Sequence, residues 1–203
     1  PISKTEINTT LLVQSGQIVV IGGTTVDDKS QTNTGVPYLK DLPLIGEFFQ
    51  GVSNSDKLTE LLTRVYGKDR FDLVINYGTA ASKTYSGLVD CTKFIQRDMD
   101  TTPMGFKIGE TPFEEEPSII DFSHIKNPIG KNLTCYTGDS FVTDIQYMDV
   151  VDMEAYALAK TCRNFGIDFV SYKYISDDGN ADDWEKNCGK GIKEFKKLLN
   201  EIL

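Results

Sequence analysis

Polar residues that could do chemistry gather in three turns, and each turn follows an apolar, strand-like run. The turns are NYGTAAS at 76–82, TGDSFVT at 137–143 and ISDDGN at 175–180. A fourth stretch, VVDMEAYA at 150–157, opens a helical pattern. Ligands of open α/β sheets bind beyond the carboxyl ends of the strands. The four stretches together therefore predict one binding site, with the two adjacent acids Asp177 and Asp178 at the end of a buried strand.

The elements that must position these turns alternate between strand and helix. Continuous apolar runs predict buried strands of a covered sheet, and apolar residues at helical spacing predict helices. The expected strands are 71–82, 87–100, 132–143 and 167–180, and the expected helices are 55–67, 149–166 and 184–203. Residues 102–117 are expected to form a loop-rich excursion that ends in an acidic run.

Residues 1–50 differ in composition from the rest of the chain. The stretch 7–26 is rich in Thr, Val and Ile around a Ser-Gly turn, which predicts a β-hairpin. Within it, GQIVVIGGTTVDD at 16–28 could be the first strand and turn of an α/β enzyme or a phosphate-binding loop. No Gly-Lys-Ser/Thr follows the glycines, which disfavours the phosphate loop.

Composition excludes several classes of protein. The 203 residues are 39% hydrophobic and 25% charged, as expected of a globular protein, and the net charge of −9 disfavours nucleic-acid binding. The four cysteines, which form no CxxC pair, and the single His124 make a zinc site improbable and predict mostly buried, reduced thiols. A surface position is expected for His124. No membrane span or signal peptide is visible, and the start at Pro1 is that of a processed product or a fragment.

The ordered set VINYGTAAS, TGDSFV, VVDMEAYALAK and YISDDGN resembles the purine nucleoside phosphorylase and nucleosidase superfamily. With FIQRDMDTTPMGF it is most similar to the hydrolytic branch, the 5'-methylthioadenosine/S-adenosylhomocysteine nucleosidases. The likeness covers residues 51–203. It implies a three-layer α/β fold with a mixed sheet flanked by helices, from which the family's first strands are missing.

Residues 1–50 resemble a different family. SGQIVVIGG followed by VPYLKDLPLIGEFF is similar to the C-terminal signature of the bacterial secretins, which are outer-membrane gates of type II and III secretion and type IV pili. The sequence therefore predicts two parts, a secretin-like β segment at 1–50 and a nucleosidase-like domain at 51–203.

The nucleosidase resemblance assigns roles to individual residues. Asp177 would protonate the leaving purine, because partial burial could raise its pKa into a useful range. Glu154 would accept hydrogen bonds from the ribose hydroxyls, Met153 would pack on the sugar, and Phe141 would stack on the purine. The backbone of Val142 would read the purine edge, Thr79 would contact the water or its anion site, and Ser176 belongs to the same substrate-binding set. Asp27 is the tentative replacement for the family's water-activating Glu, whose usual position is lost.

The expected reaction is hydrolysis of the N-glycosidic bond of a purine nucleoside, in a cytoplasmic homodimer without metal or organic cofactor. Phosphorolysis remains an alternative, although no GDPxR-like phosphate loop is present. A second alternative is a non-enzymatic component of a secretion or pilus system at the outer membrane or in the periplasm. An artificial join of two sequences is the third.

Overall fold

The structure is a computed structural model that describes residues 17–23, 71–114 and 117–202. The predicted helix at 55–67, the boundary between residues 50 and 51, and the first half of the predicted hairpin lie outside these residues. The described strands are β1 (Gln17–Gly23), β2 (Phe71–Ala81), β3 (Gly87–Gln96), β4 (Ile119–Asp121), β5 (Leu133–Thr137), β6 (Val150–Asp152) and β7 (Asp168–Asp177). The described helices are η2 (Thr102–Met104), α2 (Ala155–Phe165), α3 (Ala181–Asn187) and α4 (Ile192–Ile202).

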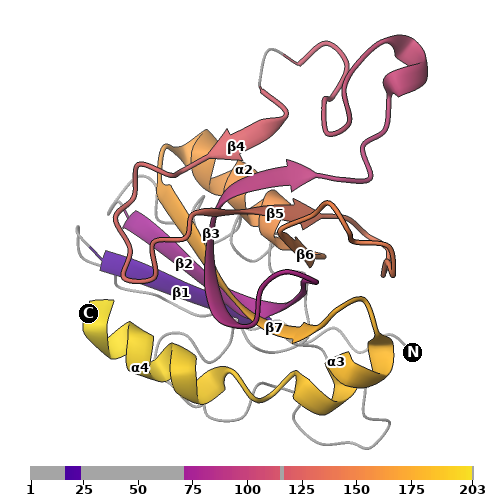
Figure 1. Cartoon of the computed structure of the whole chain (residues 1–203). Coiled ribbons are helices and arrows are strands. Elements are labelled where there is room, and N and C mark those ends of the chain that lie inside the picture. The colour runs from indigo at the N-terminus through magenta and orange to yellow at the C-terminus, as the bar shows by residue number, and fades with distance from the viewer. Residues whose placement is uncertain (1–16, 24–70, 115–116, 203) are drawn as a thin grey trace, which may run out of the picture.

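The seven strands form one mixed sheet. β2 pairs in parallel with β7, β7 pairs antiparallel with β3, and β3 pairs in parallel with β5. β5 pairs in parallel with β6, and β6 returns to β2 through the pair Val151–Ala81. The pairings therefore close into a ring of five strands, and β3 curves strongly to reach both of its long partners (Figure 1).

The strand β1 extends this sheet beyond β2. It runs parallel to β2, in a register that ends with Gly23 opposite Gly78. A strand of residues that match the secretin signature is thus part of the same sheet as the predicted nucleosidase strands. Its carboxyl end lies beside the residue that precedes Thr79.

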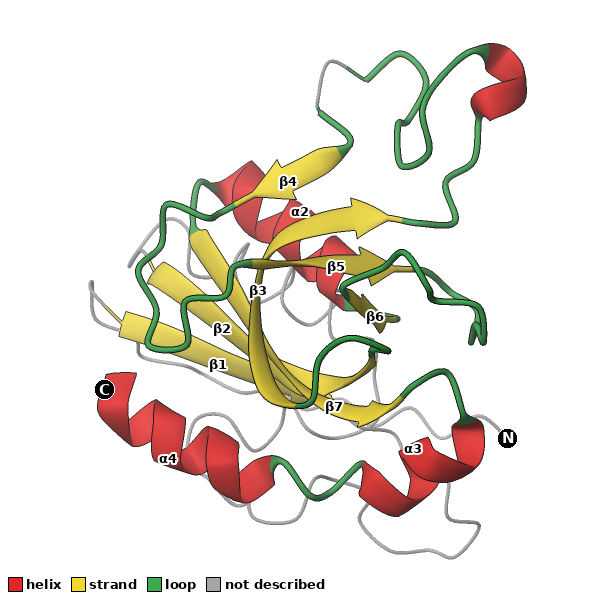
Figure 2. Ribbon diagram, viewed as in Figure 1, coloured by secondary structure: helices red, strands yellow, loops and turns green. Residues whose placement is uncertain are grey.

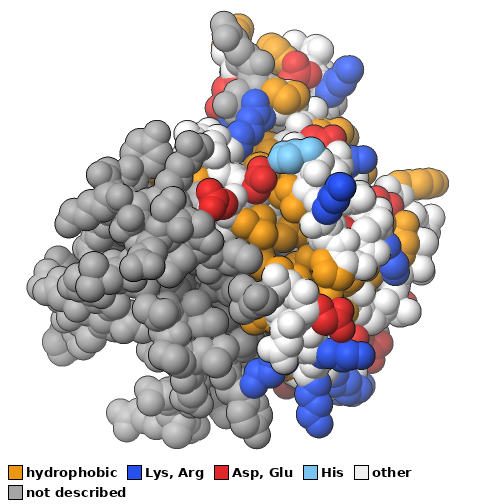
Figure 3. Space-filling view, turned by 90° about the vertical axis from the view of Figure 1, so that its left-hand side faces the viewer, with side chains coloured by type: hydrophobic (Ala, Val, Ile, Leu, Met, Phe, Trp, Pro, Cys, Tyr) orange, Lys and Arg blue, Asp and Glu red, His pale blue; other side chains and the backbone are white. Residues whose placement is uncertain are grey.

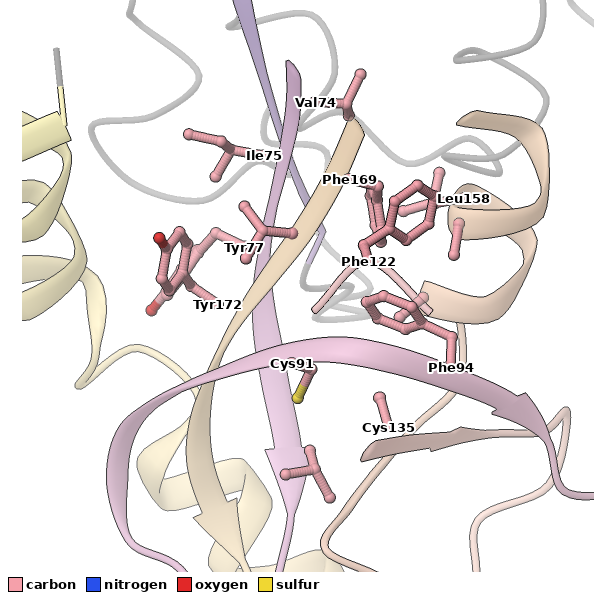
Figure 4. Close-up of a cluster of buried hydrophobic side chains, with 14 of the residues drawn as sticks. Val74, Ile75, Tyr77, Cys91, Phe94, Phe122, Cys135, Leu158, Phe169 and Tyr172 are labelled. Atoms are coloured by element: carbon pink, nitrogen blue, oxygen red, sulfur yellow. The ribbon is translucent and has the colours of Figure 1, made fainter. Parts of the chain in front are cut away.

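Helices cover both faces of the strands (Figure 2). On one side α2 buries Leu158 in the cluster that contains Phe94, Phe122 and Phe169 (Figure 4). On the other side the ring of Phe195 in α4 stacks on Tyr77, with 4.3 Å between ring centroids. The resulting arrangement of helix, sheet and helix is the expected three-layer fold.

Local signals explain where α2 ends. Its residues 155, 156, 158, 159 and 162 are buried, which is the spacing of one helical face. Gly166 then adopts a left-handed φ of 66°, and its N–H donates to the carbonyl of Arg163 at 2.9 Å. A glycine at this position stops a helix with little strain.

The C-terminal region differs from its prediction. One amphipathic helix was expected over 184–203, but the structure has α3 and α4 separated by residues 188–191. Gly191 explains the break, because a Cβ at this position would lie 2.3 Å from Cγ of Tyr174. The chain must approach the sheet at that glycine, and this close approach divides the helical pattern into two.

Candidate active site

Asp177 is the last residue of β7 and is buried, with 8% of its surface exposed. Both of its carboxylate oxygens accept hydrogen bonds, Oδ2 from the Ser176 hydroxyl and Oδ1 from the Gly179 N–H, each at 2.9 Å. Its carbonyl accepts from the Ser82 N–H at 3.0 Å. The carboxyl group is therefore held in one orientation, whereas the neighbouring Asp178 is exposed.

The turn that follows β5 lies directly against the Asp177 turn. Gly179 has a left-handed φ of 99°, and a Cβ there would lie 2.9 Å from the carbonyl oxygen of Thr143. Between this contact and β5 are Phe141, which is 49% exposed, and Val142, which packs on the small cluster around Ile145. An exposed aromatic ring is thus carried on a segment that touches the Asp177 turn.

Thr79 is half-buried in β2, opposite Tyr174 of β7. Its hydroxyl oxygen accepts a hydrogen bond from the indole Nε1 of Trp184 at 3.2 Å. Trp184 belongs to α3, so this helix is anchored over the carboxyl end of β2. Sequence reasoning missed Trp184, since a single tryptophan in a polar helix carries no motif.

Met153 and Glu154 connect β6 to α2. They reach the same end of the sheet because Val151 of β6 pairs with Ala81 of β2, which in turn pairs with Asp177. Met153 is 45% exposed and Glu154 is also exposed.

The pKa of Glu154 is raised, first by the protein atoms that surround its carboxyl group and then by the negative charge of Asp152. The positive charge of Lys173 opposes this shift. Because the residue as a whole remains open to solvent, water moderates these effects. The buried cation Lys173 thus favours the ionised form of Glu154, against the larger effects of its protein surroundings and of Asp152.

That cation belongs to a buried ion pair which sequence reasoning also missed. Lys173 Nζ lies 2.7 Å from Asp152 Oδ2, and both side chains are only 1% exposed. Burial opposes the charge on each group, but the opposite charge prevails, so the pKa of Lys173 is raised and that of Asp152 is lowered. The signal in the sequence was a lysine within the buried strand FVSYKYIS.

Asp152 also organises the start of α2. Its Oδ1 accepts from the Thr137 hydroxyl at 2.5 Å, and its Oδ2 accepts from the Ala155 N–H at 2.9 Å. Glu154, the residue at the helix N-cap, makes no side-chain cap. Because Asp152 accepts the capping hydrogen bond, the Glu154 carboxylate is not used as a helix cap.

The predicted residues thus meet at one end of the sheet, with one exception. Asp27 lies outside the described residues, so its role stays a prediction. A surface pocket of about 370 Å³ opens next to this region between α2 and the ends of β3 and β5. Of the predicted residues that the structure describes, only Met153 lines it, so the pocket adjoins the Asp177 cluster and does not contain it.

His124 lies at the surface, as expected (Figure 3). Its Nε2 is 2.8 Å from Asp168 Oδ1. The thiols of Cys91, Cys135 and Cys162 are buried, and that of Cys188 is half-buried. Within 17–23, 71–114 and 117–202, no cluster of His, Cys, Asp or Glu could hold a metal ion. The helices of the same ranges are too short or too polar to cross a membrane.

Comparison with known sequences gives two separate matches. Residues 1–66 match the family of bacterial type II and III secretion system proteins, and residues 136–203 match the phosphorylase superfamily. The chain is 40% identical over 60 residues to the secretin XcpQ of Pseudomonas aeruginosa, a match that covers 30% of this chain and 9% of that protein. The secretin match runs beyond residue 50, past the predicted boundary.

The second match is to nucleosidases. The chain is 26% identical over 157 residues to a 5'-methylthioadenosine/S-adenosylhomocysteine nucleosidase of Staphylococcus haemolyticus, covering 64% of this chain and 69% of the relative. For the Anoxybacillus flavithermus nucleosidase the identity is 30%, covering 52% and 56%. The chain thus spans about a tenth of its secretin relatives and between about half and two thirds of these nucleosidases.

Solved structures show the shared fold. A Helicobacter pylori 5'-methylthioadenosine/S-adenosylhomocysteine nucleosidase has a TM-score of 0.64 at 18% identity, covering 93% of this chain and all of the other. A futalosine hydrolase of the same organism also has a TM-score of 0.64, at 19% identity, covering 91% and 98%. The chain therefore shares the α/β fold of these solved structures, and its residues 1–66 are similar to the bacterial secretins.

Proposed function

We propose that this chain hydrolyses the N-glycosidic bond of a purine nucleoside such as methylthioadenosine, releasing adenine. The observation that carries the proposal is the buried, doubly hydrogen-bonded carboxyl group of Asp177, beside the segment that bears Phe141. The nucleosidase relatives support the same reaction class.

Breaking the bond between C1' of the sugar and the purine leaves electrons on the base and positive charge on the sugar. Asp177 acts as the general acid, which donates a proton to a ring nitrogen of the purine and makes the base a better leaving group. Phe141 stacks on the purine, an interaction worth about 1–3 kcal/mol for a base on an aromatic ring. Val142 presents its backbone to the purine edge.

A second set of residues is proposed to hold the sugar. The ionised Glu154 accepts hydrogen bonds from the ribose hydroxyls and offsets the positive charge that develops on the ring. Met153 packs on the sugar, Thr79 contacts the attacking water or its anion site, and Ser176 belongs to the substrate-binding set. Water adds its hydroxide to C1' and gives a proton to a base, for which Asp27 is the proposed residue. These roles require no metal or organic cofactor.

The proposed active unit is a cytoplasmic homodimer. Three large apolar side chains of the 102–117 excursion are exposed: Met104 (61%), Ile108 (51%) and Phe113 (90%). This excursion projects away from the sheet beyond β3 and β4 (Figure 2). Apolar side chains gathered on a projecting segment favour a protein partner, and a second copy of this chain is the proposed one.

The test is adenine release from methylthioadenosine, with and without phosphate, by the wild type and by Asp177→Asn. Loss of a general acid should lower kcat by about 10²–10⁴-fold, whereas the matched change Asp178→Asn, at the exposed neighbour, should have little effect. Release that requires phosphate would assign phosphorolysis instead. If folded wild type releases no adenine under either condition, the proposal is wrong.

A second candidate follows from the secretin match, namely a component of a secretion or pilus system. Fractionation of cells that express the chain separates the two, because a secretin component belongs to the outer membrane and the proposed enzyme to the cytoplasm. The parallel pairing of β1 with β2 favours the enzyme, since it uses the secretin-like strand inside the nucleosidase-like sheet.

A further inference from the structure

Residues 138–143, here called the purine loop, are held in place by the residues that follow β3. The N–H of Asp139 donates to Asp98 Oδ2 at 2.8 Å, and the Arg97 guanidinium donates through Nη2 to the carbonyl of Ser140. In both contacts one partner is charged, which makes a hydrogen bond shorter and stronger than a neutral one. The two contacts fall on the residues immediately before Phe141.

The two segments approach each other closely at Gly138. A Cβ on Gly138 would lie 2.7 Å from Arg97 Cζ and 2.9 Å from Asp98 Oδ2. The backbone of Arg97 adds a further bond, from its N–H to the carbonyl of Thr137 at 2.8 Å. Glycine at 138 therefore lets the purine loop lie directly on the side chains of Arg97 and Asp98.

In this position one donor of the Arg97 guanidinium is left unpaired among the described residues. Its Nε is buried and has no hydrogen-bond partner within the described part of the chain. Buried donors without a partner are rare, and each one calls for an explanation. The hydrogen bond from Nη2 to the Ser140 carbonyl holds the guanidinium in this orientation.

On its opposite side the purine loop meets the Asp177 turn, through the close approach of Gly179 to Thr143. The loop is thus fixed at both ends, by Arg97 and Asp98 at one and by the acid-bearing turn at the other. Phe141 lies between them and is 49% exposed, and the clamped backbone sets the point from which its side chain projects.

We propose that Arg97 and Asp98 are positioning residues that hold the purine loop, and with it Phe141, in the place where the purine of the substrate binds. This inference rests on the proposed function and extends it, because it assigns affinity for the base to two residues outside the site. It predicts that loosening the clamp weakens binding of the base and leaves binding of the sugar unchanged.

The experiment compares Asp98→Ala, Asp98→Asn and Arg97→Met with the wild type, and uses Asp100→Ala as the matched control. Asp100 is an exposed aspartate two residues away whose hydrogen bonds are made to Thr102 alone among the described residues. One readout is hydrogen–deuterium exchange of residues 138–143, which needs no ligand. The other is inhibition of methylthioadenosine hydrolysis by adenine and, separately, by the thiosugar product.

Asp98→Ala should speed exchange in residues 138–143 and weaken inhibition by adenine by up to about tenfold, because the loss of one hydrogen bond to the loop sets the upper limit of the effect. The thiosugar should inhibit as before, and KM should rise more than kcat falls. Asp98→Asn should recover most of the loss, because an amide oxygen can accept from the Asp139 N–H. Arg97→Met should resemble Asp98→Ala, and Asp100→Ala should resemble the wild type.

Equal weakening of adenine and thiosugar would overturn the inference, since it would indicate a general loss of structure. Unchanged exchange and unchanged adenine inhibition in Asp98→Ala would overturn it as well, and would leave the proposed function intact. A folded wild type that neither releases nor binds adenine would reject the proposed function itself, and the role in purine binding would fall with it.

Discussion

Replacing Lys173 with methionine tests the electrostatic arrangement beneath the site. The change keeps a long apolar side chain of similar length inside the ring of strands but removes the ammonium group 2.7 Å from Asp152 Oδ2. Both side chains are 1% exposed, so no solvent replaces the lost partner. Asp152 keeps its hydrogen bonds from Thr137 and Ala155.

The expected magnitude follows from this burial. Removing one partner of a buried ion pair leaves an uncompensated charge and costs about 3–5 kcal/mol. For a protein of this size that corresponds to a fall in Tm of roughly 6–20 °C. The matched control is Lys160→Met, whose partner Glu114 lies 3.0 Å away with side chains that are 31% and 40% exposed. Loss of such a surface pair costs about 1 kcal/mol or less.

The assay is urea unfolding of four variants: Lys173→Met, Lys160→Met, Asp152→Asn, and the double variant that combines Asp152→Asn with Lys173→Met. The double variant should be less destabilised than the sum of the single ones, because it leaves no unpaired charge. If Lys173→Met costs no more free energy of unfolding than Lys160→Met, the reasoning about the buried pair is refuted.

The pH dependence gives a second check on the same pair. In the wild type burial acts to raise the pKa of Asp152, but the charge of Lys173 and the hydrogen bonds to the carboxylate lower it overall. The ionised Asp152 therefore contributes stability above the unfolded pKa of about 3.9, and this contribution is lost as pH falls through the folded pKa. Without Lys173, burial should raise the pKa of Asp152. The variant's deficit in unfolding free energy should then narrow as pH is lowered from neutral towards 4.

Two further predictions concern the site. Gly179→Ala should destabilise the protein by more than about 1 kcal/mol, because φ is 99° and the new Cβ would lie 2.9 Å from the Thr143 carbonyl oxygen. The control is Gly189→Ala, where a Cβ meets nothing within 4 Å. Equal free energies of unfolding for the two variants would contradict this prediction. The protein surroundings of Glu154 and the charge of Asp152 raise its pKa above the ordinary glutamate value of about 4.3. As pH falls through this raised pKa, Glu154 becomes protonated, and the KM for nucleoside should rise. A pH profile of KM should become flat in Glu154→Gln, and an unchanged profile would remove Glu154 from substrate binding.

Several elements could be predicted from the sequence because their causes are local. The apolar run before Asp177 forms a buried strand, and the helical spacing after Glu154 forms a helix that ends at Gly166. Strand ends of an α/β sheet meet at one edge, so the turns after these runs were expected to form a common site. The single helix predicted over 184–203 was wrong, because contact with Tyr174 at Gly191 is not visible in the helical pattern.

The chemistry of the candidate residues was determined by the sequence, since an acid, an aromatic ring and a second acid follow from residue type and order alone. Their orientation was decided by the tertiary structure. The Asp152–Lys173 pair, the clamp of Arg97 and Asp98 on the purine loop, and the bond from Trp184 to Thr79 join separate strands and helices. Periodicity describes only neighbours along one element, whereas these contacts arise when the strands close into a ring and bring their partners together.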